Sequence, residues 1–301
     1  MAGTELPALN FLRLALITFP MLTLDAPAKI NLSLRVRRRR EDGFHAIATR
    51  MAPVALADRV TLERLQGAAA GTVEFSCDDP SVPADETNLA VKAVRVLEPH
   101  TGPLPGLRIH LEKRIPHGAG LGGGSSDAAA VLRGMNELLG LQLPAETLAV
   151  AAAATGSDVP FFLYGSVCDC TGRGERVTPV PDFSWRPRVL LLKPPFGVST
   201  PEAYRRWRDS REVPGLPYAA QRTPGGELVN DLERPVFEKY PVLGLLKARL
   251  LACEGVTAAL MSGSGSTVFA ILEPTTNAAS VIQAAQEVIG GELWCCDTAL
   301  R

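Results

Sequence analysis

The sequence predicts an α+β protein built from two domains. Its 301 residues, 46% of them hydrophobic, can bury more core than a single domain of ordinary size contains. Apolar residues that alternate as in strands are interleaved with apolar residues at helical spacing. In the last third, these patterns predict helices on one side of a small antiparallel sheet.

The first predicted element is a β-hairpin. Apolar and polar residues alternate in places over residues 22–36, and residues 54–65 are apolar and rich in β-branched side chains. Both patterns are typical of strands, so we expect two strands around the polar turn 37–43.

A strand, a glycine loop and a helix follow in that order. Residues 107–111 alternate cleanly, residues 116–124 are rich in glycine, and apolar residues recur at helical spacing over 128–139. A further helix is predicted over 145–154. Gly156 then occupies the position where a left-handed residue commonly ends a helix.

The second half of the chain predicts two helices and two strands. Residues 236–251 have the pattern of one amphipathic helix, and residues 278–289 predict the last helix. Between them, residues 257–261 and 268–272 predict strands on either side of a second glycine turn.

Changes in composition divide the chain into an N-terminal domain, residues 21–175, and a C-terminal domain, residues 176–301, with a mobile loop near 208–226. Residues 1–20 are expected to be an N-terminal extension. They are apolar towards their end, but they lack the basic leader and cleavage site of a signal peptide and are too short to span a membrane as a helix.

Charge and cysteine content argue against several classes of function. The 31 basic and 32 acidic side chains nearly cancel, so no broad field attracts nucleic acid or an anionic membrane. The cysteines lack the spacing of a zinc site and are expected to be reduced, as in the cytoplasm, although the alternation of Cys168 and Cys170 leaves a redox pair open.

The most informative segment is a glycine-rich run directly before a helix. Glycines allow the backbone N–H groups to approach a ligand closely, and the helix start adds free N–H groups and a positive dipole end, so the run predicts a phosphate site. A tight turn in which a serine caps the helix is the alternative. The candidate residues are Pro116, His117, Gly118, Ala119, Gly120, Leu121, Gly122, Gly123, Gly124, Ser125 and Ser126.

This run resembles the central motif of the GHMP kinases, a family of small-molecule kinases. It lacks the ending of a Walker A motif and the first-strand context of a dinucleotide fingerprint. Ala26–Leu34 resembles the first motif of the family and Leu260–Phe269 the third, in the same order. The resemblance covers about residues 22–298. It implies a two-domain GHMP kinase fold with the active site in the inter-domain cleft and ATP bound by the N-terminal domain.

Two further segments resemble one branch of that family, the diphosphocytidyl-methylerythritol kinases. Glu41–His45 is similar to their Asp-Gly-Tyr-His segment, with Phe44 in place of tyrosine, and Ala154–Phe162 is similar to their Gly-x-Asp-Val-Pro-Phe-Phe segment. The branch implies phosphorylation of the 2-hydroxyl of a cytidine diphosphate derivative of methylerythritol, a step of non-mevalonate isoprenoid biosynthesis.

The resemblance also implies roles for single residues at the reacting end. Asp158 corresponds to the catalytic aspartate, which takes the proton from the attacking hydroxyl, and Lys29 corresponds to the lysine beside it. Asn31, two residues along the same strand, points to the same side and could bond the substrate polyol. By themselves, an aspartate in a turn and a lysine at a sheet edge are also ordinary structural features.

For the substrate base, the branch implies stacking on Phe44 and Tyr204 and hydrogen bonds from His45. Phe196 is the alternative to Tyr204, and a core histidine is the alternative for His45. The arginine run 37–40 could attract a diphosphate or be a solvated turn, and it is left out of the predicted site.

ATP is the implied phosphoryl donor, with Mg²⁺. Ser125 and Ser126 are expected at its phosphates or the metal ion, while Asp127 supports the helix start; the sequence does not single out magnesium ligands or the oligomeric state. Three alternatives remain: another GHMP kinase of homoserine or mevalonate type, a catalytically silent nucleotide-binding protein, and an RNA-binding module. The intact Lys29 and Asp158 argue against the second and the neutral charge against the third.

Overall fold

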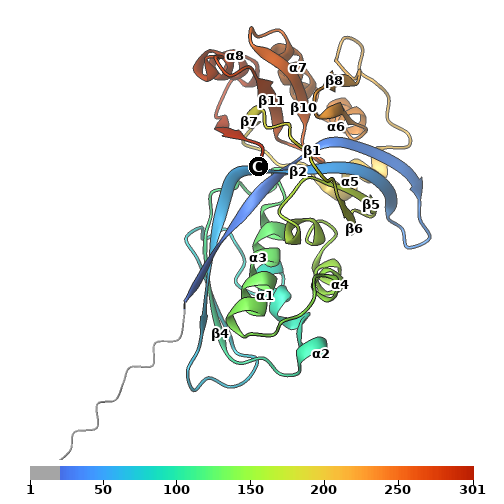
Figure 1. Ribbon diagram of the computed structural model, residues 1–301. Helices are drawn as coiled ribbons and strands as arrows, with labels where there is room; N and C mark the ends of the chain where they lie inside the picture. Colours follow the sequence, from blue (N-terminus) through green and yellow to red (C-terminus); the bar gives the residue numbers. More distant parts are fainter. Residues whose placement is uncertain (1–20) are drawn as a thin grey trace, which may run out of the picture.

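The computed structural model describes residues 21–301, and the expected extension 1–20 lies outside them. Two sheets form the centre of the molecule, and helices cover the outer face of each (Figure 1). None of the described helices combines the length and the apolar character that crossing a membrane requires.

The larger sheet has eight strands, in the order β3-β4-β2-β1-β9-β8, with the hairpin β5–β6 attached to β2. The smaller sheet has four, in the order β10-β11-β7-β12, all antiparallel. The strands are β1 (Leu22–Arg39), β2 (His45–Arg64), β3 (Val73–Cys77), β4 (Leu107–Glu112), β5 (Cys168–Gly172), β6 (Arg176–Pro179), β7 (Arg188–Lys193), β8 (Gln221–Thr223), β9 (Gly226–Asn230), β10 (Val256–Met261), β11 (Val268–Leu272) and β12 (Trp294–Ala299).

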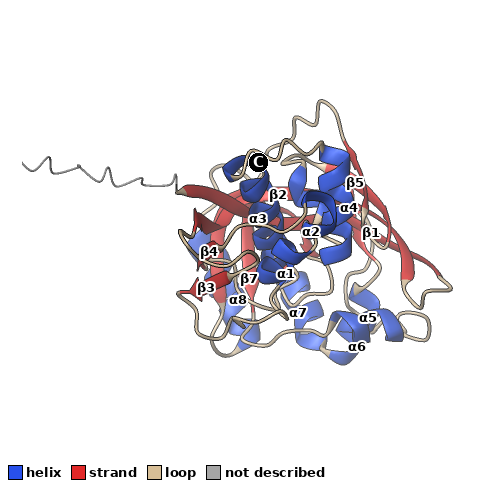
Figure 2. Cartoon of the chain, turned by 90° about the horizontal axis from the view of Figure 1, so that it is seen from below, coloured by secondary structure: helices blue, strands red, loops and turns tan. Residues whose placement is uncertain are grey.

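Helices form the two outer layers, as the second view shows (Figure 2). The helices are α1 (Leu89–Arg95), α2 (Glu98–Thr101), α3 (Gly123–Leu138), α4 (Ala145–Thr155), the 3₁₀ helix η1 (Pro160–Leu163), α5 (Thr200–Arg206), α6 (Glu233–Lys239), α7 (Pro241–Leu251) and α8 (Ala278–Ile289). Helix α3 packs on the larger sheet, α1 and α4 pack on α3, and the last two helices pack on the smaller sheet.

The long hairpin β1–β2 gives the molecule three cores. Val60 and Leu62 of β2 lie in the core with α1 and α3, while Ile30 of β1 and Val54 of β2 lie in the core against the smaller sheet. The third core lies between the smaller sheet and helices α7 and α8. The hairpin therefore connects the two halves of the chain, and the expected antiparallel sheet with helices on one side is confirmed.

The pairing of β1 with β2 is irregular at three places, one of them between Pro27 and Lys29. At that irregularity the N–H of Lys29 donates to the carbonyl of Leu121, at 2.9 Å, in the glycine-rich run. This local irregularity joins the first strand to the loop that precedes α3.

The expected helix over 236–251 is wrong, because the structure has two helices there, α6 and α7. Tyr240, between them, has φ −125° and ψ 72°, outside the helical range. Pro241 follows it, and a proline ring clashes with a helical conformation of the preceding residue. The new helix can begin at Pro241 because the first position of a helix needs no N–H donor.

The expected left-handed end of α4 is also wrong. Gly156 has φ −174° and ψ 158°, which is extended backbone open to any residue. The chain leaves the helix directly towards η1. A Cβ at Gly156 would lie 3.3 Å from Cγ2 of Val159, so this close approach favours a residue without a side chain.

The hairpin β5–β6 spans residue 175, and β9 of the C-terminal half pairs with β1 through Ser33 and Val229. The proposed division at residue 175 stays a prediction. Part of the segment 208–226 forms the short hairpin β8–β9. All six cysteines are free thiols, so Cys168 and Cys170 form no disulfide in this structure. Burial raises the pKa of the Cys170 thiol far above its usual range.

Candidate active site

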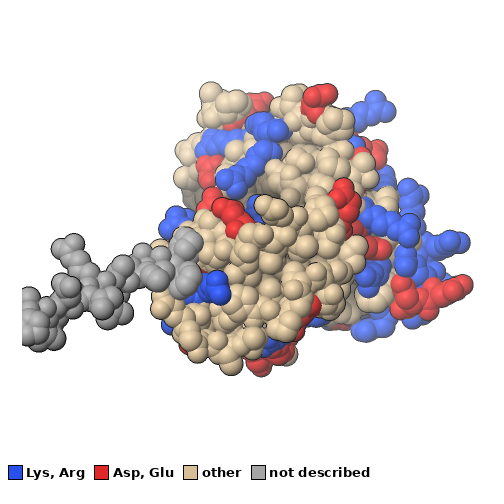
Figure 3. Space-filling view, turned by 60° about the horizontal axis from the view of Figure 1, so that its bottom comes forward, with Lys and Arg blue, Asp and Glu red and all other residues tan. Residues whose placement is uncertain are grey.

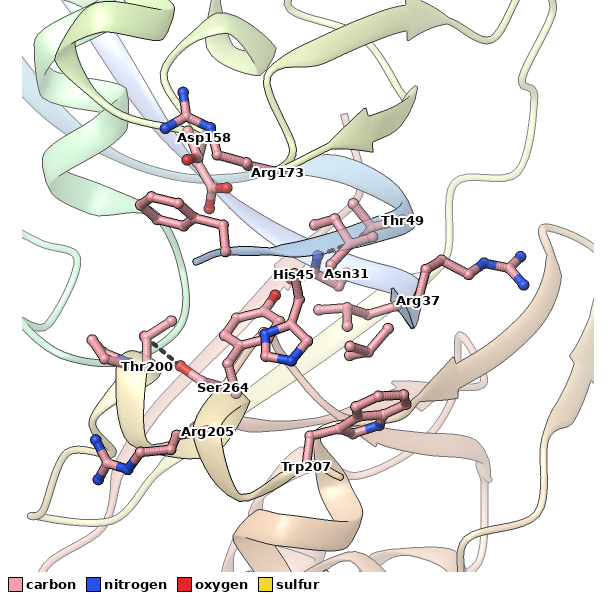
Figure 4. A pocket seen from close by; sticks show the side chains of 18 of the residues that line it. Asn31, Arg37, His45, Thr49, Asp158, Arg173, Thr200, Arg205, Trp207 and Ser264 are labelled. Carbon is pink, nitrogen blue, oxygen red and sulfur yellow. Dashed lines mark hydrogen bonds between the residues drawn. The ribbon is translucent and has the colours of Figure 1, made fainter. Parts of the chain in front are cut away.

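A cleft of about 1320 Å³ is lined by residues from both halves of the chain. One wall comes from β1, β2 and the segment around Asp158, and the other from α5 and the turn between β10 and β11 (Figure 4). The cleft contains residues of every motif singled out in the sequence. Those used below are Lys29, Asn31, Phe44, His45, Gly120, Gly122, Asp158, Tyr204 and Gly263.

The glycine-rich run is a tightly turned loop that leads into α3. Gly118, Gly120 and Gly122 have φ of 63°, 75° and 73°, a region that residues with a side chain rarely adopt. Gly122 is the N-cap of α3, and no side chain caps the helix. The alternative in which Ser125 or Ser126 caps the helix is therefore wrong, and the first N–H groups of the helix have no side-chain partner.

The residues of the run differ in exposure. Gly120 and Gly122 line the cleft, and a Cβ at Gly124 would meet no atom within 4 Å. Ala119 and Leu121 are buried in the core between the sheets. Ser126 is 1% exposed, and its hydroxyl has no hydrogen-bond partner in the part of the chain that the structure describes. The contacts of this run with ATP stay a prediction.

The second glycine turn, residues 261–267, packs directly on the first. The hydroxyl of Ser262 donates to the carbonyl of Gly120 at 3.0 Å, and the N–H of Thr267 donates to the carbonyl of Ala119 at 3.2 Å. A Cβ at Gly120 would lie only 2.3 Å from the carbonyl oxygen of Ser262. The two turns thus meet at one end of the cleft because glycine lets their backbones touch.

Lys29 and Asp158 lie side by side, as the resemblance implied. The Nζ atom of Lys29 is 3.6 Å from Oδ2 of Asp158, and it donates to Oδ1 of Asn31 at 2.7 Å. The Nδ2 atom of Asn31 donates in turn to the hydroxyl of Thr49 at 2.8 Å. Lys29 is 3% exposed, whereas 35% of the Asp158 side chain is accessible. The buried ammonium of Lys29, held by Asn31, therefore lies beside the accessible carboxylate of Asp158.

Asp158 owes its place to the turn between α4 and η1. Val159 and the first residues of η1 are buried, which anchors the chain directly after Asp158. On the other side, a Cβ at Gly174 would be 3.5 Å from Oδ1 of Asp158, so the turn between β5 and β6 closes over the carboxylate. The side chain is held at the edge of the cleft and keeps one side open (Figure 4).

Three rings form an aromatic wall away from the glycine turns. His45 stacks on Tyr204, with ring centres 5.7 Å apart and planes at 21°, and the edge of Trp207 meets His45 at 6.0 Å. Burial and then the charge of Arg39 lower the pKa of His45. Burial raises the pKa of Tyr204. At neutral pH the imidazole is uncharged, with one donor and one acceptor nitrogen.

Phe44 and Phe196 do not join this wall. Phe44 is 52% exposed at the rim of the cleft, and the Arg173 guanidinium lies 5.0 Å from its ring centre. Phe196 stacks instead on Tyr240, at 5.4 Å, inside the C-terminal core. Of Tyr204 and its alternative Phe196, only Tyr204 lines the cleft. The Tyr204 ring stacks on His45 rather than on Phe44.

Arginines surround the open side of the cleft. Its lining contains Arg37, Arg38, Arg39, Arg173, Arg205 and Arg208 but only three acidic side chains, Asp42, Asp158 and Asp209. Figure 3 shows basic side chains gathered at the right-hand edge, where Figure 1 places the far end of β1 and β2. A surplus of positive charge around a cleft attracts anionic ligands.

A buried ion triad supports the start of α3 from below. The Nζ atom of Lys113 donates to Oδ2 of both Asp58 and Asp127, and Asp58 also accepts the N–H groups of Arg114 and Ile115. Burial raises the pKa of Asp127 to about 7, against the opposing charge of Lys113. The expectation that Asp127 supports the helix start agrees with this contact. No cluster of three metal-ligating side chains occurs among residues 21–301.

Comparison with known proteins identifies the family of this chain. The family models "GHMP kinases N terminal domain" and "GHMP kinases C terminal" match residues 88–166 and 221–290. A 4-diphosphocytidyl-2-C-methyl-D-erythritol kinase of Methylacidiphilum infernorum is 44% identical over 272 residues, which cover 89% of this chain and 93% of the relative. The enzyme of the same name from Bacillus subtilis is 41% identical over 258 residues, covering 82% and 87%.

The chain belongs to the 4-diphosphocytidyl-2-C-methyl-D-erythritol kinase family. A crystal structure of a 4-(cytidine 5'-diphospho)-2C-methyl-D-erythritol kinase superposes with a TM-score of 0.72 at 36% identity, covering 93% of this chain and all of the other. A homoserine kinase from Cytophaga hutchinsonii superposes with a TM-score of 0.63 at 21% identity, covering 93% and 94%, which shows a shared fold. The predicted two-domain GHMP kinase fold is confirmed.

For a member of this kinase family, the cleft unites the expected catalytic and substrate-binding residues, but of the glycine-rich run only Gly120 and Gly122 line it. Lys29, Asn31, His45, Asp158 and Tyr204 converge on it, and Phe44 lies at its rim. Sequence reasoning missed several lining residues, among them Thr49, Arg173, Thr200, Trp207 and Ser264. Of these, only Ser264 lay within a recognised motif. The others come from separate elements, and no local pattern marks them.

Proposed function

We propose that this protein transfers the γ-phosphate of ATP to the 2-hydroxyl of 4-diphosphocytidyl-2-C-methyl-D-erythritol, giving the 2-phosphate and ADP. This is a step of non-mevalonate isoprenoid biosynthesis. The observation that carries the proposal is the Lys29–Asp158 pair, which lies between two glycine turns at one end of the cleft and an aromatic wall at the other. The related kinases named above support the same substrate.

At the reacting end, Asp158 accepts the proton of the attacking hydroxyl. Its carboxylate is accessible from the cleft, so a hydroxyl can come within hydrogen-bond reach. Lys29 stabilises the negative charge that develops on the attacking oxygen, and its ammonium is held in place by Asn31. The neighbouring Thr49 fixes the orientation of Asn31.

The glycine loop binds the phosphates of ATP. Its turned backbone and the uncapped start of α3 present N–H groups and a positive dipole end. These groups neutralise the charge of the transferred phosphoryl group without moving during the reaction, which is the main requirement of phosphoryl transfer.

Mg²⁺ prefers oxygen ligands and is bound mostly through substrate phosphates and water, with one or two protein oxygens. The hydroxyl of Ser126, which is buried at the start of α3 and has no partner among residues 21–301, would supply such an oxygen. When bound, the ion would neutralise phosphate charge.

At the far end, the aromatic wall binds the cytosine. A neutral His45 offers one donor and one acceptor to the polar edge of the base, while Tyr204 and Phe44 contribute ring faces. The arginines at the rim attract the diphosphate between the two ends. The cytoplasm, where the thiols stay reduced, is the proposed location.

A substrate panel tests the proposal. The purified protein is incubated with ATP, Mg²⁺ and either the cytidyl compound, homoserine or mevalonate, and products are identified by mass and phosphorus NMR. We expect phosphorylation of the cytidyl compound alone. Turnover of homoserine or mevalonate without turnover of the cytidyl compound would refute the proposal.

A further inference from the structure

A short segment outside every recognised motif connects the two sides of the reacting end. It consists of the end of β9 and the start of α6, residues 230–233, and is called the clasp below. Three of its side chains form hydrogen bonds with neighbouring segments. Asn230 and Glu233 bond the second glycine turn, and Asp231 bonds β1. Asn230 is 4% exposed and Glu233 is 1% exposed.

Asn230 fixes the backbone of the second glycine turn. Its Nδ2 atom donates to the carbonyls of Met261 and Gly263, at 2.7 and 2.8 Å, and its Oδ1 atom accepts the N–H of Leu232 at 2.9 Å. Both donors of the amide are thus used on the turn. Glu233 adds a third bond by accepting the N–H of Met261 at 3.0 Å.

The part of the turn that Asn230 holds lies against the catalytic lysine. A Cβ at Gly263 would be 3.4 Å from Nζ of Lys29 and 3.5 Å from Oδ1 of Asn31. The preceding residue, Ser262, bonds the first glycine loop. A displacement of the turn would therefore open both contacts at once.

The same segment is anchored to the strand that carries Lys29. Oδ2 of Asp231 accepts the N–H of Val36 at 2.8 Å, and Leu34 pairs with Asn230 in the parallel ladder between β1 and β9. The clasp thus sets the distance between β1 and the second glycine turn, and Asn230 is its link to the turn.

We propose that Asn230 is a positioning residue for the ATP end of the cleft: it holds the second glycine turn against Lys29 and the first glycine loop. This inference rests on the proposed function for the identity of the ligand. Asn230 itself is buried and does not line the cleft, so it acts through the backbone of Met261 and Gly263. Its loss should affect the nucleotide more than the acceptor, because the bonds of the Asn230 amide go to the second glycine turn, whereas the aromatic wall is bonded to α6 through Arg234, which donates to the carbonyl of Trp207.

The test compares Asn230→Ala with a matched control, Asn88→Ala. Asn88 is also buried, and its amide also bonds backbone groups: it donates to the carbonyl of Pro83 and accepts from the N–H of Ala90. It differs from Asn230 because it caps α1 rather than holding a glycine turn, and it does not line the cleft. Calorimetry measures the affinity of each protein for a non-hydrolysable ATP analogue and for the cytidyl substrate, well below the melting temperature found by circular dichroism.

We expect Asn230→Ala to weaken binding of the analogue by about tenfold or more, and binding of the cytidyl substrate by less than about twofold. Asn88→Ala should lower the melting temperature and leave both affinities unchanged. An unchanged analogue affinity in folded Asn230→Ala, or equal losses for both ligands, would overturn the inference. If Asn230→Ala is insoluble, Asn230→Ser takes its place; if both are insoluble, the residue serves the fold and the inference is wrong.

The outcome is separate from that of the proposed function. Wild-type protein that binds the analogue but does not phosphorylate the cytidyl substrate would refute the function alone. A selective loss of analogue binding in Asn230→Ala would still support the positioning role in that case.

Discussion

Replacing Asp158 by asparagine tests the centre of the proposed reaction. The amide has nearly the shape of the carboxylate, but it carries no charge and cannot accept the proton of the attacking hydroxyl. Because 35% of the side chain is exposed and its backbone is anchored by buried neighbours, the variant should fold as the wild type does. The effect should therefore appear in the chemical step.

The size of the effect follows from two contributions. Loss of a positioned general base lowers a rate by about 10²–10⁴-fold, which corresponds to about 3–5 kcal/mol of activation free energy. Part of this involves Lys29, whose Nζ lies 3.6 Å from Oδ2. Two unit charges at that distance attract by about 1 kcal/mol in water and about 5 kcal/mol at an effective dielectric constant of about 20. Exposure of Asp158 places the pair in the lower half of this range.

Single-turnover kinetics with saturating ATP and cytidyl substrate is the appropriate assay, since it isolates the chemical step from product release. Asp182→Asn is the matched control, because Asp182 is exposed in a loop outside the cleft and the chemical change is the same. We expect a fall of about 10²–10⁴-fold for Asp158→Asn and none for Asp182→Asn. Both proteins should bind both ligands as the wild type does.

A double variant shows whether Lys29 and Asp158 act on one proton transfer. Lys29→Met with Asp158→Asn should lose less than the sum of the single losses, by about 1–3 kcal/mol, in line with the attraction between the charges. Full additivity would contradict a shared role. A near-normal single-turnover rate in Asp158→Asn alone would reduce that residue to a turn position and refute the mechanism.

Four further predictions concern the substrate base and the support of α3. Phe44→Ala should weaken binding of the cytidyl substrate by about 1–3 kcal/mol and leave ATP binding unchanged; calorimetry on both ligands measures this, and equal losses would contradict it. Burial lowers the pKa of His45 below 6.5, so affinity for the cytidyl substrate, followed by calorimetry against pH, should hold constant from about pH 8 to about 6.5 and fall only below that; a midpoint above 6.5 would argue against a neutral ring. In the triad, Asp58→Asn should cost about 3 kcal/mol or more in urea unfolding because two buried N–H groups and Lys113 lose a charged acceptor. The pKa of Asp127 is raised to about 7 from 3.8, so the stability that its protonated form contributes is lost as the pH rises through 7. The wild type should therefore lose its advantage in free energy of unfolding over Asp127→Asn between about pH 5 and about pH 8. An advantage that grows with pH would contradict the raised pKa.

Local signals in the sequence identified the elements around the glycine loops but not every boundary. Alternation and glycine content were sufficient for β4, the loop and α3, because each depends on residues close together in the chain. The prediction of one helix over 236–251 was wrong because apolar spacing alone does not register the effect of Pro241. The proline ring excludes a helical conformation at Tyr240, so the helix ends there. Gly156 was assigned a left-handed role when its small size was the reason for it.

The sequence by itself determined the fold class and the family resemblance, since glycine runs and their neighbours carry that information in short segments, and through the resemblance it predicted that Lys29 and Asp158 lie together. Only the tertiary structure decided that Phe196 lies in the core, that Arg173 covers Phe44, and that Asn230 holds the second glycine turn. Each of these contacts joins residues far apart in the chain. Such contacts arise from how β1 and β2 pack between the two halves, and no local spacing encodes them.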